Sequence, residues 1–293
     1  MKKEAGLRAH IVNEFSFFWA IPAFIWQIMF FYVPLFFLII ISFMHSTDWS
    51  SWNQITLEHY VGFGRPMFAY IMLRSLLLAV VNAIICVLLA YPIAYYLSLC
   101  AFRWKNLLLF FLVLPFWTNF LVQVYAWFFV LERYGLVNSL LVYFGLISEP
   151  LSLLYTPFAV YLVMMYCYIP FAIMPIYSIL EKFDRRLLEA SSDLGATFWQ
   201  TFWRVTLPLS ASGIRTSFFM IFITSFGEFV IPDLMGGGKQ MYAGTLISHY
   251  FLVERNFNVG AAYTVLAGVV LLVSVAIFNA LFKRMFKNLR NGS

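Results

Sequence analysis

The chain has 293 residues, of which 63% are hydrophobic and only 11% are charged, and its formal net charge is +6. A soluble domain carries about 25% charged residues and about half apolar ones, so this composition excludes an ordinary soluble globular protein. Contact with anionic lipid accounts for the excess of positive charge, and we expect membrane lipid but no nucleic acid among the partners.

Five stretches of the chain contain no Lys, Arg, Asp, Glu or His. Each is longer than the roughly 20 apolar residues that cross a hydrocarbon core about 30 Å thick, so each predicts a membrane span. The first stretch is far longer than the about 7–15 apolar residues of a signal peptide, which predicts that it is retained. The five stretches are residues 15–44, 75–102, 106–131, 150–180 and 256–282.

A sixth span is predicted over residues 210–235, although this segment contains Arg215, Glu228 and Asp233. Arg215 can extend its charged end to the membrane surface while its stem stays in an apolar environment. Two further apolar segments, 134–148 and 240–253, are too short or too polar to cross a bilayer. We expect these two segments to be interfacial or re-entrant elements.

The distribution of basic residues orients the six spans. With both termini in the cytoplasm, most Lys and Arg residues fall on the inner side, as the positive-inside rule expects. We therefore expect a single all-α membrane domain over residues 1–293. It has a cytoplasmic N-terminus (1–14), a six-span core (about 15–283), a cytoplasmic loop (181–209) and a cytoplasmic tail (284–293). The basic residues outside or at the outer ends are Arg65, Arg74, Arg133, Lys239 and Arg255.

The cysteines and histidines show no pattern of a disulfide framework, a metal site or a catalytic centre. The three cysteines are odd in number and lie in or at the ends of apolar runs, which is typical of packing residues. The histidines are scattered without ligand spacing, so an integral-membrane enzyme is strongly disfavoured. These residues are Cys86, Cys100 and Cys167, and His10, His45, His59 and His249.

The loop over residues 181–209 has the sequence signals of two short helices. Asp184 is a suitable N-cap for a helix through Leu194, and Gly195 suits the left-handed position that follows a helix. Thr197 and Gln200 form a T-x-x-Q capping box that begins a second helix. Pro208 disfavours helical geometry at the residue before it, so we expect this second helix to end there.

Several apolar side chains interrupt the polar surface of this loop. They either lie flat on lipid headgroups or fill a groove on another protein, and both interpretations are compatible with the residues alone. The apolar residues are Leu188, Leu194, Phe198, Trp199 and Phe202.

The same loop resembles the EAA loop of permease subunits of binding-protein-dependent ABC importers. The family pattern is EAA, three residues, Gly, nine residues, Ile-x-Leu-Pro. This chain departs mildly, with Ser191 for the second Ala and Val205 for Ile. The resemblance implies a six-span type I ABC importer permease (MetI-like) fold in the bacterial inner membrane. It also implies that an ATPase subunit holds the loop through Glu189, Ala190, Asp193, Leu194, Gly195, Ala196, Leu207 and Pro208.

The resemblance further implies that this chain lacks catalytic residues and binds no cofactor of its own, with ATP and Mg²⁺ on the partner ATPase. Residues 236–239 (GGGK) superficially suggest a phosphate-binding loop. However, Asp233 stands where that motif requires its first Gly, and Gln240 stands where it requires Ser or Thr. We interpret this segment as a flexible turn.

Other stretches resemble the spermidine/putrescine group of these permeases. They are residues 114–127 (LPFWTN to VYAW), 169–177, and 227–237 (GEFVIPDLMGG), the last close to the group's first permease subunit. The resemblance implies polyamine import by two different permeases, an ATPase dimer and an extracytoplasmic binding protein. Gln123 departs from the Arg that is common in the group. The same architecture importing an oxyanion, iron, an amino acid or a sugar is the alternative.

Glu228 is the leading candidate for a cation path, since a carboxylate inside a span needs a polar cavity or a partner. Aromatic faces beside it would suit a chain of ammonium groups through cation–π contact. The alternatives are an ion pair of Glu228 with Arg74 or with the other permease, and lipid or packing contacts for the aromatic residues. Pro170 and Pro175 would kink the fourth span, either as a hinge or as fixed shape. The candidate path residues are Glu228, Asp233, Trp117, Gln123, Tyr125, Tyr166, Trp127 and Tyr168.

Overall fold

The computed structural model describes residues 21–45, 55–64, 66–99, 104–184 and 186–291, and the predicted N-terminal segment 1–14 lies outside these ranges. Within them the named elements are all helical, apart from an isolated antiparallel bridge between Met44 and Ile55. Six helical segments are long and apolar enough to cross a membrane, which confirms the predicted number of spans. They are Ile21–Ser42, Pro66–Ser98, Phe120–Tyr143, Pro157–Glu181, Phe198–Gly227 and Phe257–Phe286.

The chain divides into two compact units. The first comprises residues 1–64 and 250–266. Its helices are η1 (Ile28–Tyr32), α2 (Val33–Ser42), α3 (Glu58–Val61), η3 (Gly62–Gly64) and the first turns of α14 (Phe257–Asn291). Asn258 on α14 is buried and donates from Nδ2 to the carbonyl oxygen of Met44 at 2.8 Å. The hydroxyls of Ser42 and Tyr60 lie 2.7 Å apart. These bonds fix the end of α2 against α3 and α14.

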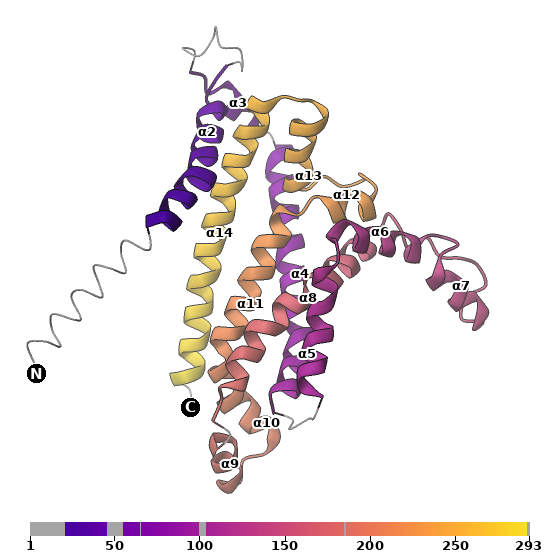
Figure 1. The fold of residues 1–293 in the computed structure, drawn as a ribbon, viewed down its shortest axis with the longest axis vertical. Coiled ribbons are helices and arrows are strands. Elements are labelled where there is room, and N and C mark those ends of the chain that lie inside the picture. Colours follow the sequence, from indigo (N-terminus) through magenta and orange to yellow (C-terminus); the bar gives the residue numbers. More distant parts are fainter. Residues whose placement is uncertain (1–20, 46–54, 65, 100–103, 185, 292–293) are drawn as a thin grey trace, which may run out of the picture. The chain divides into compact units, whose positions relative to one another are not determined.

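The second unit, residues 65–249 and 267–293, is built around three long helices. They are α4 (Pro66–Leu99), α8 (Pro157–Glu181) and α11 (Leu207–Gly227), which pack on one another (Figure 1). One face of α4 is fully buried and consists of small residues at helical spacing, so the neighbouring helices approach closely. These residues are Ala79, Ala83, Cys86, Ala90 and Ala94. A buried hydrogen bond of 2.8 Å from Asn82 to Ser225 then joins α4 to α11.

The predicted third span, 106–131, is wrong as a single helix. The structure has α5 (Lys105–Val113) and η4 (Leu114–Trp117), followed by a break and α6 (Phe120–Leu131). Thr118 is extended, and the Asn119 side chain caps α6 by accepting from the N–H of Leu121 at 2.9 Å. A cap therefore overrides the continuous apolar composition at this point. The candidate third span instead joins α6 to α7 (Leu136–Tyr143).

The predicted segment 210–235 is also divided. Its helix α11 ends at Gly227, and α12 (Val230–Gly236) begins beyond an extended Glu228. The predicted short element 240–253 contains α13 (Ala243–Ser248) and η6 (His249–Val253). The predicted tail does not begin a separate segment at residue 284, because α14 continues to Asn291.

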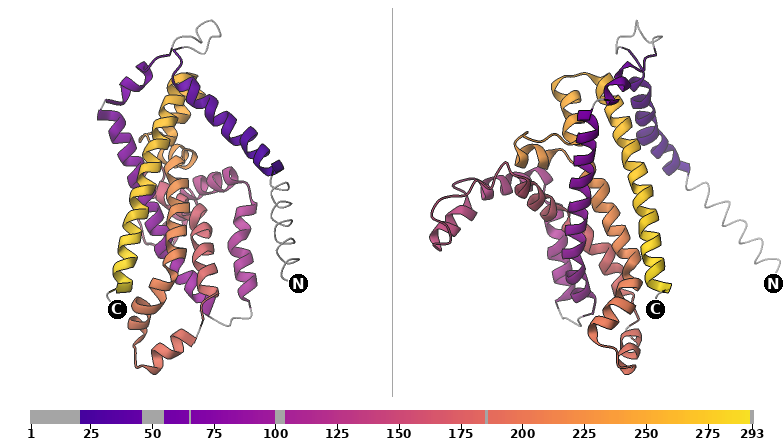
Figure 2. Two further views of the ribbon diagram at one scale, coloured as in Figure 1. Left: turned by 90° about the vertical axis from the view of Figure 1, so that its left-hand side faces the viewer. Right: turned by 180° about the vertical axis from the view of Figure 1, so that it is seen from behind.

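Two further short helices lie between α8 and α11, namely α9 (Arg186–Asp193) and α10 (Phe198–Thr201), joined to α11 through η5 (Phe202–Thr206). Within the second unit, Figures 1 and 2 place α9 and α10 at one end of the long helices. They place α12 and α13 toward the opposite end. The helix α8 runs between the two ends and contains both Pro170 and Pro175.

Candidate functional site: a helical knob and a pocket joined by one helix

We define the knob as residues 184 and 186–201, and its helix caps lie where the sequence predicts them. Asp184 Oδ1 accepts from the N–H of Arg186 at 3.1 Å, at the start of α9. Gly195 has φ +79°. The N–H groups of Gly195 and Ala196 donate to the carbonyl oxygens of Ser192 and Ser191 at 2.9 and 3.1 Å. This is the hydrogen-bond pattern of a Schellman motif, in which a left-handed residue ends the helix.

The second short helix of the knob begins as predicted. The Thr197 side chain accepts from the N–H of Gln200, and the Gln200 side chain accepts from the N–H of Thr197. Thr197 is therefore the N-cap of α10, and the capping box is complete.

The predicted end of this helix before Pro208 is wrong. The helix continues from Phe198 to Gly227 without interruption. At the junction, the Leu207 N–H donates to the carbonyl oxygen of Phe202, five residues earlier. This π-helical turn widens the helix just before the proline, where an α-helical turn would bring the ring against the preceding turn. The α10 part of the knob therefore forms one rod with η5 and α11, whereas α9 is separated from it by the turn at Gly195.

The knob presents apolar side chains on its outer surface. Leu194 is 88% exposed, Phe198 61% and Trp199 66%, while Leu188 and Phe202 are half-buried. The ring of Phe202 packs edge-on against Tyr91 of α4, with ring centroids 5.7 Å apart. The predicted coupling residues Glu189, Ala190, Asp193, Leu194 and Gly195 are exposed, whereas Ala196, Leu207 and Pro208 are half-buried.

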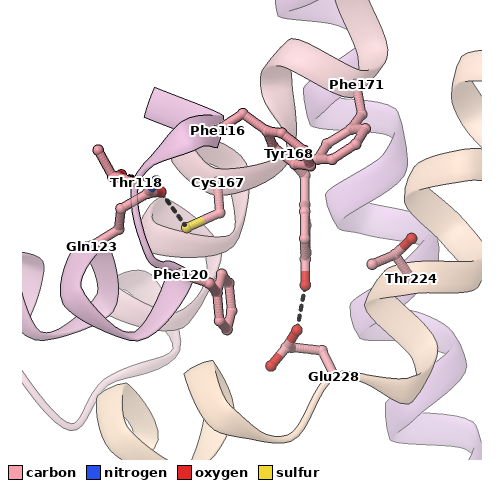
Figure 3. Close-up of a pocket in the computed structure, with 9 residues that line it drawn as sticks. All are labelled: Phe116, Thr118, Phe120, Gln123, Cys167, Tyr168, Phe171, Thr224 and Glu228. Atoms are coloured by element: carbon pink, nitrogen blue, oxygen red, sulfur yellow. Dashed lines mark hydrogen bonds between the residues drawn. The ribbon is translucent and has the colours of Figure 1, made fainter. Parts of the chain in front are cut away.

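A pocket of about 460 Å³ lies where η4, α6, α8 and α11 meet (Figure 3). Three phenylalanine rings form apolar walls, and most of the other groups are hydrogen-bond acceptors or donors without charge. Glu228 carries the one formal charge among the described lining residues. The lining residues are Phe116, Thr118, Phe120, Gln123, Cys167, Tyr168, Phe171, Thr224 and Glu228.

Glu228 lies at the break between α11 and α12, and not inside a membrane-spanning helix as the sequence predicted. Its Oε1 accepts from the N–H groups of Val230 and Ile231 at 2.9 and 3.3 Å, which satisfies the first donors of α12. Its Oε2 accepts from the hydroxyl of Tyr168, toward which the carboxylate points in Figure 3. Backbone and hydroxyl donors therefore compensate the cost of keeping this half-buried carboxylate away from bulk water.

Arg74 does not pair with Glu228, so that alternative from the sequence is wrong. The Arg74 guanidinium lies over the rings of Tyr70 and Tyr242, at 5.2 and 5.9 Å from their centroids. In the part of the chain that the structure describes, no salt bridge joins Arg74 to the carboxylate.

Gln123 fixes the break in the third span. Its Nε2 donates to the carbonyl oxygen of Pro115 and to Thr118 Oγ1, the latter at 2.6 Å. Pro115 O also accepts from the N–H and the hydroxyl of Thr118, at 3.1 and 2.6 Å, so the three residues form one hydrogen-bonded cluster at the end of η4. Gln123 thereby holds η4 against the first turn of α6, while its amide lies on the pocket wall.

The structure brings only some of the predicted path residues together. Glu228, Gln123 and Tyr168 line the pocket, whereas the other candidates lie outside its lining. Trp117 is 76% exposed, and Tyr166 packs against Trp127 with ring centroids 5.2 Å apart. Sequence reasoning missed Thr118 and Thr224. The first could have been found from the polar Thr–Asn pair that breaks an apolar run, and the second from its position one turn before Glu228. The candidates outside the pocket are Asp233, Trp117, Tyr125, Tyr166 and Trp127.

Comparison with known proteins adds relatives across nearly the whole chain. A family model described as "Binding-protein-dependent transport system inner membrane component" matches residues 86–291. The chain is 37% identical over 270 residues to the spermidine/putrescine transport system permease protein PotB of Haemophilus influenzae, covering 92% of this chain and 93% of that one. It is 36% identical over 253 residues to PotB of Escherichia coli K12, covering 85% and 92%.

A solved structure shares the fold. It is a chain of a bacterial ABC transporter involved in the import of the acidic polysaccharide alginate, with a TM-score of 0.76 at 19% identity. The match covers 95% of this chain and 98% of that chain. This likeness confirms the all-helical importer-permease fold that the EAA-type loop implied.

Proposed function

The chain belongs to the family of binding-protein-dependent transport system inner membrane components, and from that premise we propose that it imports polyamines such as spermidine and putrescine. The family and the six apolar helices make it a multi-pass protein of the bacterial inner membrane and a transport subunit, not an enzyme. The observation that carries the substrate is the similarity to two relatives named as spermidine/putrescine permeases, over most of both chains.

The proposed complex contains this chain, a second permease, an ATPase dimer and an extracytoplasmic binding protein. ATP and Mg²⁺ are held by the ATPase, and this chain supplies the knob that docks on it. The exposed Leu194, Phe198 and Trp199 favour this role, because docking in a protein groove would remove their apolar surface from water. The alternative is that these residues lie flat on lipid headgroups. Crosslinking distinguishes the two, because only a docked knob would be crosslinked to the ATPase.

The continuous helix from Phe198 to Gly227 supports a mechanical link between the knob and the pocket. A displacement of α10 by the ATPase would be carried along the rod to Glu228, while Tyr168 belongs to the neighbouring helix α8. Opening and closing of the translocation path would then change the position of Glu228 relative to Tyr168. The π-helical turn over Phe202–Thr206 is the place where this rod is least regular.

The pocket suits part of a polyamine path. A polyamine is a flexible chain of ammonium groups joined by methylenes, so it needs acceptor oxygens and apolar walls side by side. Glu228, Tyr168 and Thr118 supply oxygens, and Phe116, Phe120 and Phe171 supply walls. Trp117, Tyr125, Tyr166 and Asp233 stay predictions for parts of the path outside this pocket.

Uptake by the reconstituted complex tests the function. The complete complex in proteoliposomes is supplied with labelled putrescine, spermidine, an amino acid, a sugar, phosphate and ferric iron in separate assays. We expect ATP-dependent accumulation of at least one polyamine and none of the controls. Uptake of a control solute but of neither polyamine would contradict the substrate and leave the importer architecture in place.

A further inference from the structure

We propose that the Glu228 pocket binds one ammonium group of the transported polyamine, and that this ammonium replaces the Tyr168 hydroxyl as the donor to Glu228 Oε2. The proposal rests on the proposed function, because it takes the substrate class from it. It adds a particular binding atom, a competing residue and an order of events.

The chemistry of the pocket fits an ammonium ion. Glu228 is the one formal charge among the described lining residues, so the pocket has a negative charge to offer and no cation to repel the ligand. The hydroxyls of Thr118 and Thr224 add neutral acceptors, and the rings of Phe116 and Phe120 give faces for cation–π contact. A volume of about 460 Å³ lies within the range of about 300–1,000 Å³ that small-molecule sites occupy.

The two oxygens of Glu228 have different partners, and Oε2 is the one that a ligand can take over. Oε1 accepts from the N–H groups of Val230 and Ile231 and so is committed to α12. Oε2 accepts from Tyr168 on the pocket wall. An ammonium is a charged donor, so the carboxylate attracts it through opposite charge as well as through the hydrogen bond, whereas a neutral hydroxyl offers the hydrogen bond alone. The substrate can therefore displace Tyr168 without disturbing the start of α12.

Displacement of Tyr168 has a structural consequence. The Tyr168–Glu228 hydrogen bond joins α8 to the segment that follows α11, which is the far end of the rod that begins at the knob. When an ammonium takes Oε2, this connection between α8 and the rod is lost. Occupation of the pocket thus favours movement of the rod relative to α8. Bound substrate would therefore lower the free-energy cost of the rod movement that the ATPase drives.

A cysteine at position 224 can report on the pocket directly. Thr224 is exposed within the lining, and Cys is close to it in size. The test uses the assembled complex with Thr224→Cys and the three native cysteines replaced by Ala, after retained polyamine uptake has been verified. The probes are a cationic and a neutral methanethiosulfonate of similar size. We expect the cationic probe to react faster, and spermidine or putrescine to protect the thiol.

The two central variants have opposite expected effects. Glu228→Gln keeps an acceptor for α12 but removes the charge, so the preference for the cationic probe and the polyamine protection should fall about tenfold. Tyr168→Phe removes the competing donor, so half-maximal protection should need roughly three- to tenfold less polyamine. Glu132→Gln and Tyr143→Phe, which are exposed residues outside the pocket, serve as matched controls and should change neither value.

Three results would overturn the inference. One is unchanged probe preference and protection in Glu228→Gln. Another is weaker protection in Tyr168→Phe, which would make Tyr168 a ligand and not a competitor. A third is protection by a neutral solute as strong as by polyamine. Any of these in a complex that still imports polyamine refutes the pocket alone, whereas absence of polyamine uptake in the unmodified complex refutes the proposed function.

Discussion

Lys105 Nζ lies 3.0 Å from Glu181 Oε1, and this ion pair joins the first residue of α5 to the last residue of α8. The Tyr177 hydroxyl donates to the same Glu181 oxygen at 2.6 Å, and the Lys105 ammonium lies 5.1 Å from the centre of the Tyr177 ring. The cluster therefore sits where α8 leads into the knob. It holds the end of α8, which connects the pocket to the knob, against the start of α5.

Breaking this ion pair should have a small effect on stability and a larger one on coupling. Lys105→Met should lower the free energy of unfolding by about 0.2–1 kcal/mol, because the two side chains are partly exposed. The amount of polyamine transported per ATP hydrolysed should fall clearly, because the end of α8 is no longer held against α5. Thermal unfolding and the ratio of uptake to ATPase rate measure the two effects. Lys182→Met, one residue beyond α8, is the matched control, and an equal loss of coupling in it would count against the role of the pair.

Gly213 should tolerate no side chain. A Cβ at this position would lie 2.9 Å from the carbonyl oxygen of Pro175 and 3.0 Å from the Cα of Ile176, both on the backbone of α8. Gly213→Ala should therefore push α8 and α11 apart and cost about 1–3 kcal/mol of stability, as overpacking does. Gly268→Ala, where a Cβ meets nothing within 4 Å, is the control and should be neutral or stabilising. Equal unfolding temperatures for the two variants would show that α8 and α11 are not tightly packed here.

The sequence predicted what depends on composition and on local side-chain chemistry. Long uncharged runs identified the spans because lipid contact needs apolar residues over a fixed length, and Asp184, Gly195 and Thr197 marked the helix ends because their signals are local. The capping residues of the knob therefore occupy the predicted positions.

What the sequence did not reveal depends on competition between signals. At Asn119 a cap breaks a run whose composition would permit one helix, and at Pro208 a π-helical turn preserves a helix that the proline was expected to end. The pocket exists because of the first of these, since the break places Thr118 and Gln123 beside α8. Neither outcome follows from apolar length or from a single residue's preference.

Gly195 should be sensitive to backbone conformation and not to size. Its φ of +79° is unfavourable for residues with a Cβ, yet a Cβ there would meet nothing within 4 Å. Gly195→Val should therefore displace the knob most, Gly195→Ala less, and Gly195→Asn least, because Asn tolerates the left-handed region. Gly195→Asp should insert normally but abolish transport, since it adds a charge to the docking surface as well.

The ratio of uptake to ATP hydrolysis in proteoliposomes measures this series, with membrane insertion checked by the yield of assembled complex. The expected order of coupling is Asn, then Ala, then Val. Normal coupling in Gly195→Asp would mean that the knob is peripheral to ATP-driven transport, and equal losses in Asn and Val would exclude backbone strain as the cause.

A neutral residue at position 123 should leave the negative charge of Glu228 available to the substrate. The group that the chain resembles commonly has Arg at this position, but in this chain Glu228 is the one formal charge among the described lining residues. An Arg at position 123 would therefore pair with it and compete with a substrate ammonium for the carboxylate. We expect kcat/KM for polyamine uptake to fall about tenfold, a loss of about 1.4 kcal/mol in transition-state stabilisation. Gln123→Met is the control, because it removes the hydrogen bonds to Pro115 and Thr118 without adding charge. It should lower the unfolding temperature but leave most of the polyamine uptake in place. If the Met variant instead lost uptake as strongly as the Arg variant, the contribution of Gln123 would lie in holding the break between η4 and α6, and not in keeping the pocket free of positive charge.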